Sequence, residues 1–147
     1  MTTYGMPIQR PHCSIDNTKE AIFMDRKDAE IFAQLAVDYW KLMRAFDRTR
    51  AIAGQPHEAR LEAQAKYADG RLTSALNAAS MRLVSFDGAA YTADLPVSAI
   101  NADEFPDQAE AGLRVASTLE PAVIQDMTVI RTGRVALEPC DAPAKKE

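Results

Sequence analysis

Few of the residue types that commonly do chemistry stand at spacings that would let them act together. The two histidines, His12 and His57, lie far apart, and neither has a second ligand at the spacing of a metal site. Ser74, Ser80 and Ser85 have no neighbouring base, and the sequence contains no glycine-rich phosphate loop and no GxSxG, CxxC or HExxH motif. We therefore expect no catalytic residues, no metal and no cofactor, and we expect that the protein is not an enzyme.

Other polar and aromatic candidates have a simpler structural explanation. Asp103-Glu104 falls in the acidic, turn-rich stretch 101–112, which predicts an exposed loop whose charges favour solubility. Tyr39 and Trp40 could line a ligand pocket, but their helical spacing favours a place in a core or an interface.

The charge of the chain argues against nucleic acid as a partner. The formal net charge is −4, and no basic run is longer than Lys145-Lys146. Binding to nucleic acid depends on clustered lysine and arginine, so we expect none.

Membrane insertion and secretion are not expected either. No stretch approaches the roughly 20 apolar residues of a membrane span. The N-terminal residues lack a charged region followed by an apolar core, so they do not resemble a secretory signal. Cys13 and Cys140 could pair, but two incidental thiols in a reduced cytoplasmic protein are the simpler interpretation. We expect a cytoplasmic location.

Residues 28–83 carry the helical signals of the sequence. An apolar stripe at spacings of three and four predicts a first helix from Asp28, which ends before Gly54 and Pro56. Pro56 then starts a second helix, whose seven-residue repeat of leucine and alanine continues to Leu83. The short connection between them predicts an antiparallel helical hairpin.

The apolar face of this hairpin is too wide for one neighbouring helix to cover. We expect two copies of the hairpin to form a dimeric four-helix bundle. The alternative is that the β-strands or the N-terminal arm fold back over the helices. The residues expected at the dimer interface are Leu35, Trp40, Leu42, Phe46, Leu61, Leu72, Leu76 and Leu83.

Residues 84–138 are expected to form a small all-β module. Asp87-Gly88 is a strong turn signal, and 91–95 and 97–100 are short strand candidates separated by Pro96. Short β-branched runs broken by turn formers then predict a meander of small strands, at about Leu113–Thr118, Val123–Gln125, Thr128–Arg131 and Arg134–Leu137. The predicted fold class is therefore α+β, with an irregular arm at 1–27, the hairpin at 28–83, the β module at 84–138 and a disordered tail at 139–147.

The last part of the chain resembles the C-terminal β domain of the GrpE family, which contains nucleotide-exchange factors of DnaK-class chaperones. The order of parts, a pair of bundle-forming helices before short strands, is also that of the family. The residues that fall on matching positions are Val115, Leu119, Val129, Ile130, Arg131 and Val135, with Leu137 on a conservative one. The sequence departs from the family where Glu120-Pro121-Ala122-Val123 replaces a QxGY motif, where the first arginine of RVLRPA is lost, and where the long N-terminal stalk helix is missing.

The resemblance implies a co-chaperone that binds a chaperone ATPase domain and promotes ADP release, and that acts as a homodimer. By position, it places Thr128, Val129, Arg131 and Leu137 at the surface that contacts the partner. Residue patterns alone leave a second class open, a non-enzymatic structural or assembly subunit whose hairpin packs into a larger complex.

Overall fold

A computed structural model describes residues 24–53, 56–106 and 112–140, and it confirms an α+β protein in which two helices precede small sheets. The irregular arm predicted at the N-terminus, apart from its last residues, and the tail from 141 onward lie outside the described residues, as do His12 and Cys13. The elements in chain order are α1 (Arg26–Ala53), α2 (Glu58–Ala78), β1 (Met81–Val84), β2 (Val97–Ala99), a 3-10 turn (Ala102–Glu104), β3 (Leu113–Glu120), β4 (Ala122–Gln125), β5 (Thr128–Arg131) and β6 (Gly133–Pro139).

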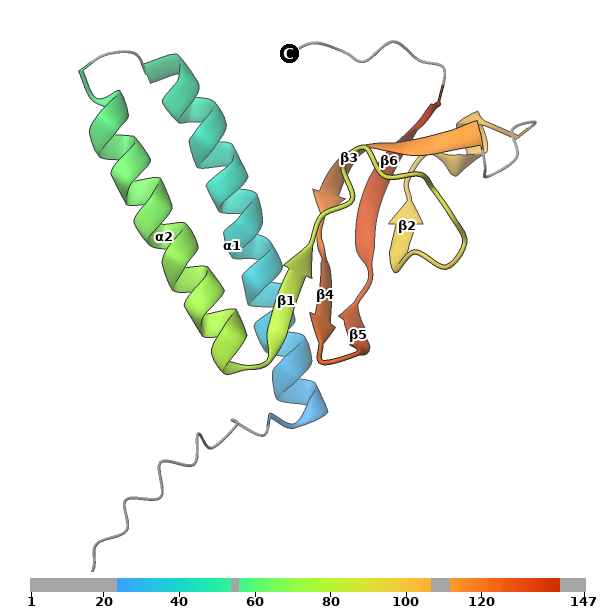
Figure 1. The fold of residues 1–147 in the computed structure, drawn as a ribbon, viewed down its shortest axis with the longest axis horizontal. Coiled ribbons are helices and arrows are strands. Elements are labelled where there is room, and N and C mark those ends of the chain that lie inside the picture. Colours follow the sequence, from blue (N-terminus) through green and yellow to red (C-terminus); the bar gives the residue numbers. More distant parts are fainter. Residues whose placement is uncertain (1–23, 54–55, 107–111, 141–147) are drawn as a thin grey trace, which may run out of the picture.

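The helices α1 and α2, which we call the helix pair, lie side by side and run in opposite directions (Figure 1). The hydroxyl of Tyr39 donates a hydrogen bond to the carbonyl of Ala68 at 3.1 Å. Further along the pair, Arg50 Nη1 lies 3.9 Å from a carboxylate oxygen of Glu62.

The strands form two three-stranded sheets. In the first sheet, the order is β1-β4-β5 and all pairs are antiparallel. In the second sheet, the order is β2-β6-β3, with β2 parallel and β3 antiparallel to β6. The buried Pro121 separates β3 from β4, so the chain changes sheets at this corner.

A hydrophobic core joins the first sheet to the helix pair. Small side chains on one face of α1, including the fully buried Ala33 and Val37, pack with Leu76 of α2, Met81 of β1 and Val123 of β4. Alanine at these positions lets the helix approach the strands closely. The predicted boundary between helices and β module at 83/84 is therefore crossed by a shared core. In this part of the molecule, strands pack against the helices, as the alternative prediction described. The dimer itself stays a prediction.

The second sheet has its own smaller core. Leu113, Val115, Val135 and Leu137 alternate along β3 and β6 and are buried on one face. Three aromatic side chains from the connecting segments cover this face: Phe86, Tyr91 and Phe105. The stretch 91–95 was predicted as a strand, but only an isolated bridge between Ala90 and Arg114 forms next to it.

The end of the second helix differs from its prediction. The heptad pattern predicts a helix to Leu83, but α2 ends at Ala78 and Met81–Val84 forms β1. Ser80 takes a positive φ of 54°, which ends the helix without a glycine. Leu83 then pairs with Val123 of β4 and contributes to the shared core.

The acidic stretch 101–112 begins with a hydrogen-bonded turn, whose residues Ala102–Glu104 are exposed as predicted. Asn101 accepts a hydrogen bond from the Leu137 amide at 2.8 Å and donates one to the Leu137 carbonyl at 3.0 Å. The turn Ala102–Glu104 follows, and Phe105 packs on the second core. Residues 107–111 are outside the described part of the chain.

Candidate functional site

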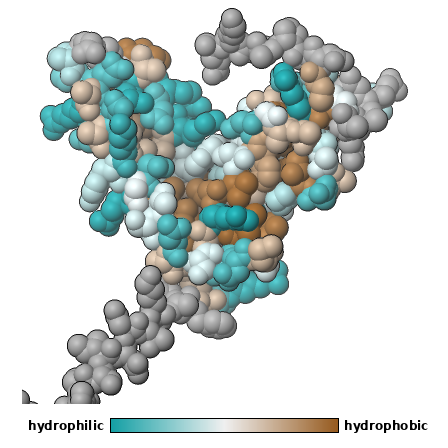
Figure 2. Space-filling view, in the orientation of Figure 1, coloured by the Kyte–Doolittle hydropathy of each residue, from teal (hydrophilic) through white to brown (hydrophobic). Residues whose placement is uncertain are grey.

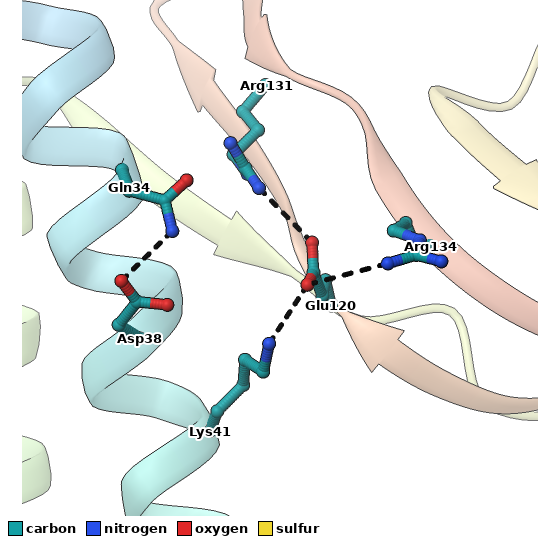
Figure 3. A network of polar contacts seen from close by, with 6 residues as sticks. All are labelled: Gln34, Asp38, Lys41, Glu120, Arg131 and Arg134. Carbon is teal, nitrogen blue, oxygen red and sulfur yellow. Dashed lines mark hydrogen bonds and ion pairs between the residues drawn. The ribbon is translucent and has the colours of Figure 1, made fainter.

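The most concentrated polar contacts of the described residues surround Glu120, at the junction of the helix pair and the two sheets (Figure 3). Lys41 Nζ of α1 lies 3.0 Å from Glu120 Oε1, and Arg131 Nη2 of β5 lies 3.3 Å from Oε2. Arg134 Nη1 of β6 is 4.0 Å from Oε1. The carboxylate therefore connects α1 to the ends of β3, β5 and β6.

These cations set the charge state of Glu120. The hydrogen bond from Lys41 is the largest influence and lowers the pKa of Glu120, while burial of the carboxyl raises it to a smaller extent. Hydrogen bonding from Arg131 lowers the pKa further, and the net shift is below the ordinary value. Glu120 is thus an ionised structural contact, and among the described residues its charged partners are the three cations.

Arg131, the predicted charged contact for a partner, is engaged inside the protein. One guanidinium nitrogen bonds Glu120, and its buried Nε has no hydrogen-bond partner within the described residues. Its guanidinium therefore connects the first sheet to Glu120 of the second sheet, and only part of the side chain is exposed to solvent.

Leu137 cannot serve as a contact residue, so that prediction is wrong. Its side chain is buried in the second core. The sequence carried a signal for this, because Gly133, Val135 and Leu137 alternate along β6, and alternate residues of a strand share a face. Val135 is fully buried, and Leu137 faces the same way.

Thr128 and Val129 are exposed, as a contact role requires, and they follow a two-residue turn at Asp126-Met127. We call residues 126–129 the β4–β5 tip. Met127 is the most exposed large apolar side chain of the described residues, at 91%. Sequence reasoning missed it, although a turn former between two β-branched runs is the signal of such a hairpin.

The β4–β5 tip is fastened to the end of α2. The amide of Asp126 donates to the Ser80 carbonyl at 3.1 Å, and Gln125 Nε2 donates to the Ala79 carbonyl at 3.1 Å. Asp126 itself takes a positive φ of 51°, which the tight turn requires. These bonds hold the tip in a fixed position relative to the helix pair.

The residues predicted for a dimer interface fall into three groups. Leu76 is buried in the core of the protomer and is not available to a second copy, and the half-buried Leu83 packs against the same core. Leu35 and Leu42 are exposed on one face of α1. Half-buried positions make up the rest: Trp40, Phe46, Leu61 and Leu72.

An apolar groove runs between the helices beside the exposed leucines. Its walls are side chains of both helices: Phe32, Leu35, Ala36, Tyr39, Tyr67, Ala68, Arg71, Leu72 and Ala75. Tyr67 and Leu35 are both well exposed at its rim. This face of the helix pair presents contiguous apolar surface to solvent.

The described residues contain neither a metal-binding cluster nor a helix that could cross a membrane. Within residues 24–53, 56–106 and 112–140, no group of three or more His, Cys, Asp or Glu side chains is placed to hold a metal ion. In the same ranges, neither helix combines the length and apolar character needed to cross a bilayer. Comparisons of the chain with protein-family models, with curated proteins and with solved structures found no match.

Proposed function

We propose that this protein is a GrpE-like nucleotide-exchange factor, a co-chaperone that binds the ATPase domain of a DnaK-class chaperone and promotes release of ADP. The observation that carries the proposal is the β4–β5 tip, an exposed apolar turn on a small sheet that hydrogen bonds fix to a helix pair. The order of parts, helices and then short strands, is the one expected from the resemblance.

Such a factor works through binding energy alone and needs no catalytic side chain. A protein that binds the open conformer of an ATPase more tightly than the closed one shifts the equilibrium by its differential affinity. The contact must be rigid, because a surface that adapts to both conformers would bind them equally. The bonds from Asp126 and Gln125 to the end of α2 give the tip this rigidity.

The resemblance placed the contact on Thr128, Val129, Arg131 and Leu137, and the burial of Leu137 and the internal bond of Arg131 revise that set. In the proposal, the contact surface consists of Met127, Thr128 and Val129. Arg131 acts indirectly, because its bond to Glu120 positions the strand that carries the tip.

In this proposal, the helix pair is an antiparallel hairpin. It associates with the hairpin of a second copy to form a four-helix bundle. Leu35, Leu42 and Tyr67 supply the exposed apolar surface that the association would bury. The full chain should sediment at twice 16.1 kDa. Leu35→Glu should shift it to the mass of one chain without loss of helix, because the side chain lies outside the protomer core. Wild-type protein that sediments as a single chain at micromolar concentration would contradict the dimer.

The exchange function is tested by the release rate of fluorescently labelled ADP from a DnaK-class ATPase of the same source. Wild-type protein should accelerate release, and Met127→Glu should reduce the acceleration at least about tenfold, because a charge would be desolvated in the contact. Ile52→Glu is the matched control, since Ile52 is also nearly fully exposed, at 86%, and belongs to the last turn of α1. This end of α1 lies away from β4 and β5 (Figure 1).

The control variant should accelerate release as wild type does. No acceleration with any such ATPase from the same source would remove the proposal. Equal effects of Met127→Glu and Ile52→Glu would mean that the β4–β5 tip is not the contact surface.

The exposed apolar groove favours a second candidate, a structural or assembly subunit. In that case, the helix pair would pack into a larger complex through Leu35, Leu42 and the groove walls. Purification of the tagged protein from native extract would then return a stoichiometric complex without a chaperone, and Leu35→Glu would dissociate it. Recovery of a chaperone ATPase in that purification would favour the first candidate.

A further inference from the structure

One face of α1 carries cations that point toward the strands. Lys41, Arg44 and Arg48 are spaced by three and four residues, so they share one face of the helix. Lys41 contacts Glu120 of β3, and Arg44 Nη2 lies 4.0 Å from Asp87, in the segment between β1 and β2. Arg48 continues this face by one turn; it is exposed, and it has no ion-pair partner within the described part of the chain.

The strands near this face of α1 carry cations as well. Arg131 and Arg134 come from β5 and β6 and share the single carboxylate of Glu120 with Lys41. The side chain of Arg134 is 58% exposed and its distance to Glu120 is 4.0 Å, which leaves most of its donors free for another acceptor.

We name these five cations the basic valley: Lys41, Arg44, Arg48, Arg131 and Arg134. Among the described residues, Glu120 and Asp87 are the acidic groups that contact them, and Asp38 at the edge keeps its negative charge while it accepts a hydrogen bond from Gln34 at 2.9 Å. The indole of Trp40 lies under the Arg44 guanidinium, 4.9 Å from the ring centroid, and restricts where that guanidinium can point. The positive charge of the surface therefore exceeds what its own carboxylates neutralise.

The basic valley lies where two arms of the molecule meet. In Figure 1, the second half of α1 and the second sheet diverge from their junction as two arms. The space-filling view shows the molecular surface hollowed between these arms, with hydrophilic side chains along the helical side (Figure 2). A concave surface of one charge sign concentrates its field and attracts a ligand of the opposite sign.

We propose that the basic valley binds an acidic segment of a partner protein. The formal charge of the whole chain is −4, so the rest of the surface is acidic and repels a long phosphate backbone. A short acidic peptide segment contacts only the valley and avoids that repulsion. The guanidinium groups of Arg44 and Arg134 match the planar geometry of glutamate and aspartate carboxylates. This site does not use the β4–β5 tip and stands whether or not the protein promotes nucleotide exchange.

The test measures binding of the full-length protein to a short fluorescein-labelled peptide of alternating Glu and Ala, by fluorescence anisotropy at low salt. Arg48→Glu should weaken binding about fivefold, because an attraction of surface charges becomes a repulsion. Arg134→Gln should weaken it about twofold to threefold through loss of one cation. Neither side chain is part of a core, so both variants should retain the circular dichroism of wild type.

Arg60→Glu is the matched control, since Arg60 is an exposed arginine of α2 and its reversal changes the net charge equally. The control should keep the wild-type affinity within about twofold, and added salt should weaken wild-type binding. Equal losses for Arg48→Glu and Arg60→Glu would overturn the proposal, and so would absence of binding by wild type. Tighter binding of a single-stranded oligonucleotide with the same dependence on Arg48 would overturn it in favour of nucleic acid.

Discussion

Replacing Glu120 by Gln keeps the shape of the side chain and removes the charge that holds Lys41, Arg131 and Arg134. Two of these cations make direct hydrogen bonds, at 3.0 and 3.3 Å. A hydrogen bond to a charged group contributes about 1.5–3 kcal/mol when it is shielded from water. The cationic side chains are 48% and 35% exposed, so each contribution is reduced to about 1 kcal/mol. Because the amide oxygen still accepts one bond, we expect the free energy of unfolding to fall by about 1–2 kcal/mol.

This loss should depend on pH in a defined direction. The pKa of Glu120 in the folded protein lies below its ordinary value of 4.5. At neutral pH, the carboxylate is ionised in both states and its stabilisation is complete. As the pH falls below about 4.5, the unfolded chain binds a proton while the folded protein does not, so the stabilisation decreases until the folded pKa is passed. The difference in stability between wild type and Glu120→Gln should therefore shrink in acid.

Urea unfolding followed by the fluorescence of Trp40, the single tryptophan, measures both effects. With an m-value of roughly 1–3 kcal/mol per molar urea, the midpoint should fall by about 0.5–1 M at neutral pH. Glu30→Gln is the control, because its ion pair with Arg26 is exposed and should contribute under about 0.5 kcal/mol. Equal losses for the two variants, or a Glu120→Gln difference that persists unchanged in acid, would refute the role assigned to Glu120.

Three further substitutions test the space around individual residues of the helices and strands. Gly133→Ala should lower the free energy of unfolding by about 1–3 kcal/mol in urea titrations, because its Cβ would lie 2.9 Å from the Ala122 nitrogen and from the Glu120 carbonyl oxygen; an unchanged midpoint would contradict that close approach. Ala33→Leu should cost about 1–3 kcal/mol by the same assay, since Ala33 is fully buried where α1 meets the first sheet; tolerance would mean that the helix does not pack there. Gly70→Ala should raise the stability by about 0.5–1 kcal/mol and increase the thermal midpoint, because Gly70 is inside α2 with open space around it; a lower midpoint would contradict that exposure.

The elements with strong local signals were predictable from the sequence. The periodicity of 28–53 marked α1, and the four predicted strands between residues 113 and 137 overlap β3, β4, β5 and β6. The strand β1 was missed because Leu83 extends the heptad of the second helix as well as it fits a strand. Its identity is decided by pairing with β4, about forty residues later in the chain, which no local pattern contains.

The contacts of Glu120 and Arg131 were also beyond local reasoning. A single glutamate in a β-branched run is ordinarily a solvated residue. No neighbouring residue in the sequence indicates the cations that surround its carboxylate. Lys41 comes from α1, and Arg134 reaches it because β6 pairs with β3. The exposure of Arg131 was overestimated for the same reason, since its partner Glu120 lies in a different sheet.

The proposed exchange function depends on differential affinity, and equilibrium binding measures that quantity directly. Isothermal titration of the full-length protein into a DnaK-class ATPase domain of the same source should be compared between the nucleotide-free and the ADP-bound form. We expect binding to the nucleotide-free form that is tighter by at least about 100-fold, which corresponds to roughly 2.7 kcal/mol of bias toward the open conformer. Equal affinity for the two forms would contradict it, because a protein that binds both conformers equally cannot shift their populations.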